Sequence, residues 1–357
     1  MKKTTLIFAS LFAASFAMAQ APVNTSTVTQ VGQTNEATVG QTGTVGNNSE
    51  IFQAARNNEA TVSQVTTGAN DPNRTNSIIS QTGRTNEATV SQINGGGTEA
   101  WRGLLNAGID QSGNDNEAIQ TQGGHPQMGV SNAFITQSGN NNYGEQYQVK
   151  YGNNANLVQS GNGNFGVQFQ DKFLPEDYEG SNNTASMVQS GSNNYGQQYQ
   201  DGWSNKGYVT QSGNNNSAIQ RQGVAAWVST AEIIQAGNGN EARQDQVGNL
   251  NNGFILQTSN GNLATQDQFS GARRTGANYA DLNFGSIVQE GGSGNIASQV
   301  QTTPGGDIVA NYATIFQSGA GNTANQMQTG GFNSSVISQT GSGHIANVTQ
   351  TFTGGAN

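Results

Sequence analysis

Glutamine side chains recur along this chain at a fixed spacing. Thirteen times a Gln is followed eleven residues later by a second Gln, except in the unit ending at Gln301, where the spacing is twelve. A carboxamide both donates and accepts hydrogen bonds, so identical amides that stack in register can bond to one another in a ladder. The first Gln of each unit falls at Gln30, Gln53, Gln81, Gln111, Gln137, Gln159, Gln189, Gln211, Gln235, Gln257, Gln289, Gln317 and Gln339.

An Asn lies six residues before the second Gln in almost every unit, and we expect it to stack in the same way. An amide ladder is satisfied only in register, because each buried polar group left unpaired costs about 1–3 kcal/mol. The residues that we expect to form these ladders are Gln30, Asn35, Gln41, Gln53, Asn58, Gln64, Gln81, Asn86, Gln92, Gln317, Asn322, Gln328, Gln339 and Gln350.

Catalytic chemistry has little support in this sequence. There are two histidines, His125 and His344, and no cysteine, and nothing places a Ser–His–Asp arrangement. The glycine patterns lack the strand-to-helix context of a phosphate loop. One carboxylate per unit is not a coordination shell for a divalent ion. We therefore expect no enzymatic activity, no cofactor and no metal site.

Each unit consists of two similar halves. The first reads N-x-(A/S/G)-x-(I/V/L/M)-x-Q and the second N-x-(A/G)-x-(V/Q)-x-Q, as in the unit from Asn47 to Gln64. The shared residues occupy every second position, which indicates a strand with one distinctive face. The four residues between the halves, such as SGNN after Gln137, have turn chemistry, because Gly and Asn tolerate positive φ.

One strand–turn–strand unit has too few apolar residues to bury a core alone. A fixed period of 20–50 residues is the signature of a repeat architecture, in which stacked neighbours share a continuous core. The sequence therefore predicts an all-β chain, a β-solenoid of about thirteen strand–turn–strand rungs that form two facing parallel sheets. The five prolines and three tryptophans are all expected in linkers between units: Pro22, Pro72, Pro126, Pro175, Pro304, Trp101, Trp203 and Trp227.

The first residues have the pattern of a secretory signal. Lys2 and Lys3 form a basic start, an apolar run follows from residue 6 to residue 16, and Ala17-Met18-Ala19 is a small-x-small cleavage site. We expect residues 1–19 to be removed, residues 20–23 to form a short segment, residues 24–350 to form the solenoid and residues 351–357 to form a tail.

Composition limits the partners of the mature chain. Without Lys2 and Lys3 it carries 11 basic and 22 acidic residues, a net charge of −11, which argues against a nucleic-acid partner. No apolar run after the signal is long enough to span a membrane. The Gly-, Asn- and Gln-rich composition is typical of disordered chains, but a disordered chain has no reason to keep a strict period.

The spacing Q-x-G-x-x-N-x-A-x-x-x-Q, clear at residues 30–41 and 81–92, resembles the curlin repeat. Curlins are the secreted subunits of curli, the extracellular amyloid fibres of bacterial biofilms. The resemblance implies a solenoid that polymerises end to end, as a homopolymer that serves adhesion and matrix building. It also implies a nucleator subunit and an outer-membrane export apparatus as partners. Whether this chain is the main subunit or the nucleator stays open.

Aromatic residues occupy outward positions in three consecutive units and should form two parallel columns on one face. One interpretation is reinforcement of the sheet, since stacked pairs add about 0.2–1 kcal/mol each. The other is a contact stripe for lateral bundling of fibres or for a glycan. The residues are Tyr143, Tyr147, Phe165, Phe169, Tyr195 and Tyr199.

Glutamates occupy one outward position in the first four units, at Glu36, Glu59, Glu87 and Glu117. They either form a solvated face or act as gatekeeper charges that delay assembly. Arg56 and Arg84, in adjacent turns, are candidates to offset part of their repulsion.

Three classes of function compete. The first and preferred one is a polymerising structural subunit at the cell surface. The second is a monomeric or minor solenoid adhesin or nucleator that binds a surface or polysaccharide, which would need polar caps at both ends. The third is an ice- or polysaccharide-binding solenoid, which would want a flat array of Thr. The first and last units are ordinary copies of the motif, which favours open ends.

Overall fold

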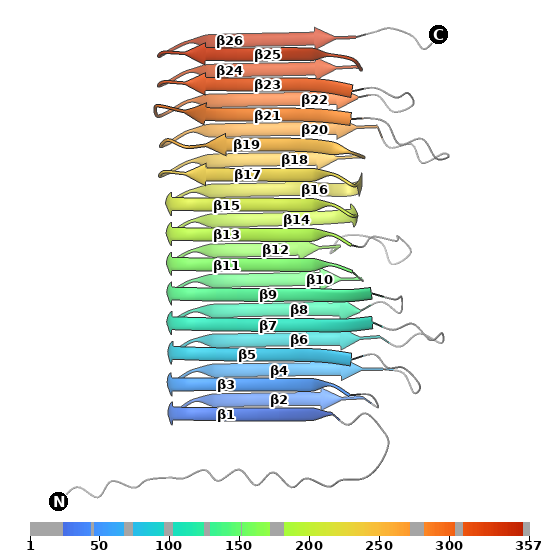
Figure 1. The fold of residues 1–357 in the computed structure, drawn as a ribbon, viewed down its shortest axis with the longest axis vertical. Helices are drawn as coiled ribbons and strands as arrows, with labels where there is room; N and C mark the ends of the chain where they lie inside the picture. Colours follow the sequence, from blue (N-terminus) through green and yellow to red (C-terminus); the bar gives the residue numbers. More distant parts are fainter. Residues whose placement is uncertain are drawn as a thin grey trace, which may run out of the picture.

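The computed structural model describes residues 24–43, 46–67, 74–95, 103–124, 129–150, 152–171, 182–271, 282–303 and 310–352. These residues form a tall stack of strands, with β1 at the bottom and β26 at the top (Figure 1). The expected signal at residues 1–19, the segment 20–23, the five prolines and Trp101 lie outside the described residues.

Two sheets of thirteen parallel strands make up the solenoid, one from the first half of each unit and one from the second. The first sheet contains β1 (Thr25–Gln33), β3 (Asn48–Arg56), β5 (Arg74–Arg84), β7 (Gly103–Asn114), β9 (Gly129–Asn140), β11 (Asn154–Asn162), β13 (Thr184–Ser192), β15 (Lys206–Asn214), β17 (Thr230–Ala236), β19 (Asn251–Gln257), β21 (Leu282–Glu290), β23 (Ala310–Ser318) and β25 (Ser334–Thr340).

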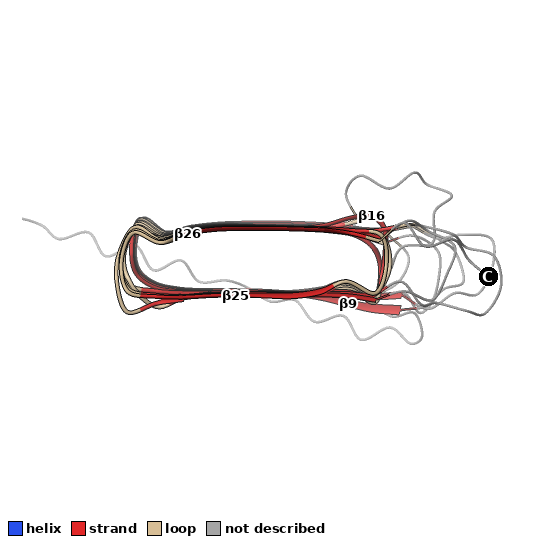
Figure 2. Cartoon of the chain, turned by 90° about the horizontal axis from the view of Figure 1, so that it is seen from above, coloured by secondary structure: helices blue, strands red, loops and turns tan. Residues whose placement is uncertain are grey.

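The second sheet contains β2 (Glu36–Thr42), β4 (Glu59–Thr66), β6 (Glu87–Asn94), β8 (Glu117–Gly124), β10 (Tyr143–Val149), β12 (Phe165–Gln170), β14 (Tyr195–Trp203), β16 (Ser217–Trp227), β18 (Glu241–Val247), β20 (Leu263–Ser270), β22 (Ile296–Thr303), β24 (Thr323–Thr329) and β26 (Ile345–Thr351). Seen along the stack, the two sheets face each other as the long sides of a flat oblong (Figure 2). The β-solenoid of thirteen rungs predicted from the repeat is confirmed.

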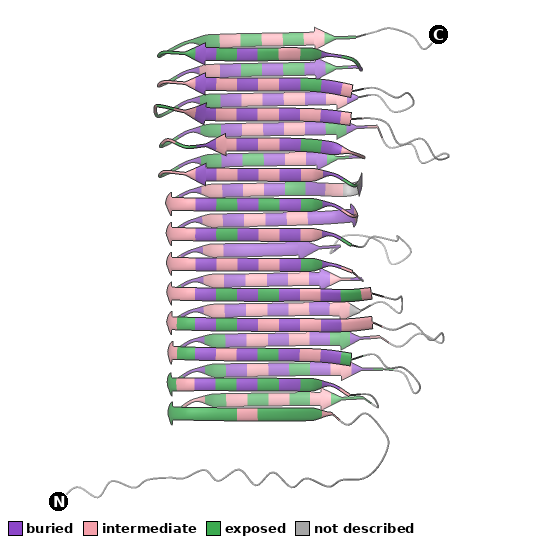
Figure 3. Ribbon diagram, viewed as in Figure 1, coloured by how far each residue is buried: buried purple, intermediate pink, exposed green. Residues whose placement is uncertain are grey.

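Each strand pairs with its counterpart in the next unit, so like residues lie over like residues. In the first pair Gln30 lies opposite Gln53 and Val28 opposite Ile51. The alternation of sequence becomes an alternation of burial, visible as stripes along the strands in the middle of the stack (Figure 3). Aliphatic side chains such as Ile79 and Leu157 are fully buried between the sheets and form a thin, continuous core.

The turns between the two halves stack as regularly as the strands. Gly83 has φ 114°, and a Cβ there would lie 1.9 Å from the carbonyl oxygen of Gly113 in the next turn. Thr85, two residues on, also has positive φ. Glycine is therefore required in this turn both by the left-handed backbone and by the close approach of the turn above.

The strands extend further than the repeat pattern indicates. Pairing continues past the first Gln into the expected four-residue joint, where Ser138 lies opposite Ser160 and Gly139 opposite Gly161. Identical turns in adjacent rungs keep the backbones at strand spacing, so hydrogen bonding does not stop at the last inward side chain.

The expectation that all three tryptophans lie in linkers is wrong for two of them. Trp203 ends β14 and Trp227 ends β16, and the two residues pair with each other. The register shifts between Gln200 and Gly202, and this irregularity absorbs the extra residues of the upper unit before pairing resumes.

Candidate functional site

The candidate functional features of this molecule are its hydrogen-bonded amide ladders and the two open ends of the stack. The first Gln of every unit donates a hydrogen bond from Nε2 to Oε1 of the Gln in the next unit, from Gln30 up to Gln339, over 2.7–2.9 Å. The second Gln does the same from Gln41 to Gln350 over 2.7–3.1 Å.

The Gln side chains also tie the two sheets together. Gln53 donates to the carbonyl oxygen of Glu36 at 2.8 Å, and Gln64 donates to that of Asn48 at 2.9 Å. Each of these two amides therefore donates one N–H along the stack and one across it, and its oxygen accepts a hydrogen bond from the rung below. This satisfies a polar group that is otherwise costly to bury.

The Asn that opens the second half of each unit forms a third vertical chain. Its Oδ1 accepts a hydrogen bond from the backbone N–H of the residue one rung above, as Asn35 does from Asn58 at 3.0 Å. Its Nδ2 closes the turn, as Asn58 does on the carbonyl oxygen of Ala54 at 2.8 Å and on that of Gly83 at 3.0 Å.

The predicted ladder residues fall into two groups. Those inside the stack are buried, with at most 1% of each residue exposed: Gln53, Asn58, Gln64, Gln81, Asn86, Gln92, Gln317, Asn322 and Gln328. Those in the first and last units have one neighbouring rung instead of two: Gln30, Asn35, Gln41, Gln339 and Gln350.

A further Gln ladder was missed by the sequence reasoning, which treated an aliphatic residue and Gln as equivalents at this inward position. It runs through nine units of the second sheet, from Gln120 to Gln326, with Nε2–Oε1 distances of 2.7–3.1 Å. Val39, Val62 and Val90 occupy the position below it, and Val348 occupies it above. The sequence does contain a signal for this ladder, because Gln recurs two residues before the second Gln in these nine consecutive units.

All three Gln ladders have the same direction, with the donor in the lower rung. At the bottom of the stack, Gln30 and Gln41 therefore present an acceptor oxygen that no rung below occupies. At the top, Nε2 of Gln339 and Gln350 each make a cross-sheet bond, to the carbonyl oxygens of Thr323 and Ser334. Their second N–H points to where a next rung would lie.

His344 replaces Asn in the last rung and ends the Asn chain. Its backbone N–H donates to Oδ1 of Asn322 at 3.0 Å, as in every other unit. Its ring nitrogen Nε2 lies 3.0 Å from the carbonyl oxygen of Thr340, four residues earlier, which is the position that the Asn Nδ2 contacts in the other turns. The imidazole thus keeps the turn closed.

The expected aromatic columns lie on the outer face of the second sheet. Phe165 stacks between Tyr143 and Tyr195, with ring centroids 4.9 and 5.1 Å apart and planes within 8°. In the other column Phe169 packs edge-on against Tyr147 and stacks on Tyr199. Arg221 lies 5.6 Å from the centroid of the Tyr199 ring.

The rings of the first column use their faces for one another, whereas in the second column Tyr147 meets Phe169 edge to face. Burial raises the pKa of Tyr143 to about 12, and the neighbouring Glu145 adds to the shift. This packing favours reinforcement of the sheet over the alternative, a sticky outer stripe.

The four glutamates stack directly over one another, from Glu36 to Glu117. Partial burial, and then the charge of Glu87, raise the pKa of Glu117. In the described part of the chain, no ion pair joins Arg56 or Arg84 to this column, whereas Arg243 pairs with Asp245 elsewhere on the second sheet.

The described residues contain no group of three or more His, Cys, Asp or Glu side chains that could hold a metal ion. A helix of the length and apolarity needed to cross a membrane is likewise not found in the described ranges.

With this geometry in place, comparison with protein-family models gives a match. The model of the curlin associated repeat matches residues 327–351, which span the end of β24, all of β25 and β26. The curlin resemblance is thereby confirmed, and the chain carries a curlin repeat. A search of curated proteins found no entry that matches. The repeat and the β-solenoid are structural rather than catalytic features.

Proposed function

We propose that this protein is a secreted structural subunit that polymerises head to tail into extracellular curli-like amyloid fibres, in the service of adhesion and biofilm matrix. The observation that carries the proposal is the common direction of the amide ladders. The top of the stack presents amide donors at Gln339 and Gln350, and the bottom presents amide acceptors at Gln30 and Gln41.

Only a head-to-tail junction pairs these groups. Two tops would bring donors against donors, and two bottoms would bring acceptors against acceptors. Unpaired buried amides cost about 1–3 kcal/mol each, so the reversed junctions are disfavoured at both Gln ladders that reach the ends. Head-to-tail contact instead continues both ladders from one molecule into the next.

The apolar positions of the two ends also match. Val39 at the bottom and Val348 at the top occupy the position that is Gln in nine central units. In the first sheet Val28 would face Ile337. A junction would therefore bury aliphatic side chains against aliphatic side chains and would leave no inward Gln facing an aliphatic residue. A protein that works as a monomer would not need its two ends to match in this way.

The proposed fibre needs secretion and, by analogy with other curlins, partners. The curlin repeat is the repeat of extracellular curli subunits, and the basic and apolar start of the chain has the pattern of a secretory signal. We extend the proposal to a nucleator subunit and an outer-membrane export apparatus, and we assign the protein no enzymatic role.

Proline substitutions at the open edges test the proposal. In a parallel ladder successive N–H groups point alternately to the two neighbours. The N–H of Glu36 donates upward to Asn58, so the N–H groups at the inward positions, such as Val28, point downward. In β1 that direction is the open edge. Val28→Pro therefore removes a donor that the monomer does not use but the junction needs.

The matching substitution at the top is Asn347→Pro in β26, where the N–H groups of the outward positions point to the open edge. We expect both proline variants to stay folded, by circular dichroism, and to fail to extend seeds of the parent protein. Val28→Ala and Asn347→Ala keep the N–H and serve as matched controls. Normal seeded growth of both proline variants would refute head-to-tail polymerisation.

A further inference from the structure

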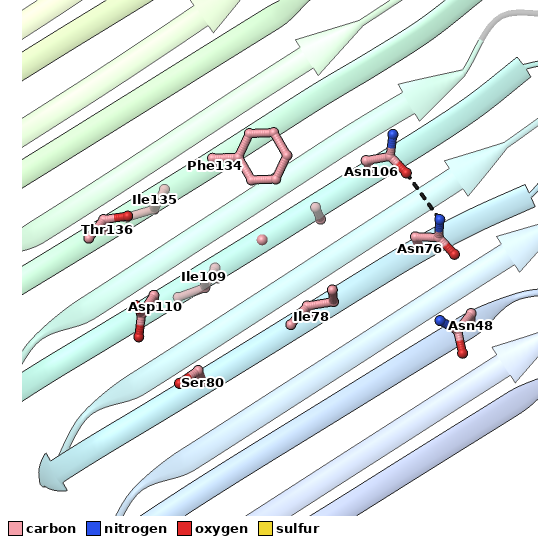
Figure 4. Close-up of a pocket in the computed structure, with 12 residues that line it drawn as sticks. Asn48, Asn76, Ile78, Ser80, Asn106, Ile109, Asp110, Phe134, Ile135 and Thr136 are labelled. Atoms are coloured by element: carbon pink, nitrogen blue, oxygen red, sulfur yellow. Dashed lines mark hydrogen bonds between the residues drawn. The ribbon is translucent and has the colours of Figure 1, made fainter.

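A hollow on the outer face of the first sheet is lined by an apolar centre and a polar rim. It lies across β5, β7 and β9 and has a volume of about 490 Å³, in the range of small-ligand sites (Figure 4). Its origin is Gly108, which occupies an outward position between Ile78 on one side and Phe134 on the other. The missing side chain leaves the backbone of β7 as a floor.

Gly108 also sets the orientation of the Phe134 ring. A Cβ at position 108 would lie 2.7 Å from Cδ1 of Phe134 and 3.1 Å from Cε1, so the ring rests against the glycine backbone. In Figure 4 the ring is seen nearly face-on and lies flat along the sheet. Phe134 is 45% exposed and Ile78 is 53% exposed. The hollow therefore offers solvent a free aromatic face, unlike the stacked columns of the second sheet.

Hydrogen-bonding groups flank this face on both sides. Asn76 and Asn106 lie on one side, joined by a hydrogen bond of 3.1 Å from Nδ2 of Asn76 to Oδ1 of Asn106. Asp110 and Thr136 lie on the other, and both are exposed. Asn106 also donates from Nδ2 to Oδ1 of Asn132 at 2.9 Å, so each of the two carboxamides keeps part of its hydrogen-bonding capacity for a ligand. The carboxylate is an acceptor for two or more hydroxyls.

We propose that this hollow binds a pyranose ring of a glycan that carries no negative charge. The C–H face of a sugar ring is weakly positive and suits the negative face of an aromatic ring. The hydroxyl groups at the edges of the sugar reach the amides on one side and the carboxylate on the other. Asp110 is the one charged residue of the lining, so the site repels acidic sugars and favours neutral sugars and amino sugars.

This inference goes beyond fibre formation and does not depend on it, because the hollow is complete within one molecule. In a fibre it would recur once per subunit, and a long glycan that contacts several copies would gain avidity over a single site. Binding is therefore best measured on the mature chain before it polymerises.

The test uses three defined hexasaccharides with NMR or calorimetric titration: cellohexaose, the glucosamine hexamer at pH 6 and oligogalacturonate. We expect the first two to bind, the glucosamine hexamer more tightly, and oligogalacturonate to bind at least tenfold more weakly. Phe134→Ser removes the platform, and Gly108→Ala forces the ring off the sheet. Each should weaken binding of cellohexaose about tenfold.

Two further variants make the result specific. Asp110→Asn keeps hydrogen bonding but removes the charge, so it should weaken the glucosamine hexamer several-fold more than cellohexaose. Tyr208→Ser is the matched control, since Tyr208 occupies the same position on the same sheet in β15 and is 37% exposed. Its binding should equal that of the parent. The proposal is overturned if Phe134→Ser and Gly108→Ala bind as the parent does, or if oligogalacturonate binds as well as cellohexaose.

Discussion

At the scale of single residues, buried polar groups decide the stability of this solenoid. Gln189 donates to Oε1 of Gln211 and to the carbonyl oxygen of Phe165, and accepts from Gln159. Its replacement breaks a vertical ladder and a cross-sheet tie together, at a position that is fully buried from solvent.

Gln189→Ala should therefore lower the free energy of unfolding by several kcal/mol, since two or three partners each lose about 1–3 kcal/mol. Urea unfolding followed by circular dichroism measures this loss. Val188→Ala is the neighbouring control, because Val188 points outward and is 38% exposed. It should cost less than about 1 kcal/mol. Equal losses at the two positions would contradict the ladder as a source of stability.

Asp171 gives the solenoid a dependence on pH. Its carboxylate accepts hydrogen bonds from Nδ2 of Asn153 at 2.7 Å and of Asn183 at 3.1 Å. Burial raises the pKa of Asp171 from 3.8 to about 7, against the lowering effect of its hydrogen bonds with the Asn153 side chain and the Gly202 backbone N–H. Because the folded state holds this proton more tightly than the unfolded state, the contribution to stability is present below pH 4 and is lost as the pH rises through 7.

We expect the free energy of unfolding to fall between pH 4 and pH 7.5, by at most about 4 kcal/mol from this group at 1.36 kcal/mol per pKa unit. The readout is the slope with pH, measured by thermal or urea unfolding. Asp171→Asn removes the titrating group, so its slope should be shallower whatever the variant loses in absolute stability. A parent whose stability rises over this range would contradict the assignment.

At the scale of elements, repetition made the fold predictable. The period of the inward residues indicated strands, turns, parallel pairing and the first two Gln ladders. The direction of the ladders could not be predicted, because an amide can donate either way until its cross-sheet partner fixes it, as the carbonyl of Glu36 fixes Gln53. The tilt of the Phe134 ring could not be predicted either, because it depends on Gly108 in the neighbouring strand β7.

The aromatic columns should act as reinforcement of the second sheet. Phe165 stacks on both sides, so Phe165→Ala removes two ring contacts worth about 0.5–1.5 kcal/mol each in addition to apolar burial. We expect a clear loss of stability in urea and no change in lateral bundling of fibres in electron micrographs. A variant of parental stability whose fibres no longer bundle would instead favour the contact-stripe interpretation.

The glutamate column should slow the first steps of assembly. Stacked carboxylates repel, and at the upper end of the column the charge of Glu87 adds to burial in raising the pKa of Glu117. Replacing Glu36, Glu59, Glu87 and Glu117 with Gln should shorten the lag phase followed with an amyloid dye, and added salt should shorten it in the parent. If the length of the lag phase responds to neither change, the glutamate column is only a solvated face and does not delay assembly.

At the scale of the whole molecule, the two ends are complementary to each other and not to themselves. Thirteen rungs at about 4.8 Å each give a subunit roughly 60 Å tall. The two Gln ladders that reach both ends would continue from one subunit to the next, whereas the Asn chain ends at His344. Association entropy opposes the junction, so the pairing of side chains at the ends decides whether it forms.

The most direct test is a high-resolution electron cryomicroscopy reconstruction of fibres grown from the mature chain. The account predicts a polar fibre with a repeat of about thirteen rungs, roughly 60 Å, in which Gln339 and Gln350 continue the ladders onto Gln30 and Gln41 of the next subunit. Fibres whose subunits meet top to top, or associate through the sheet faces with free ends, would contradict it.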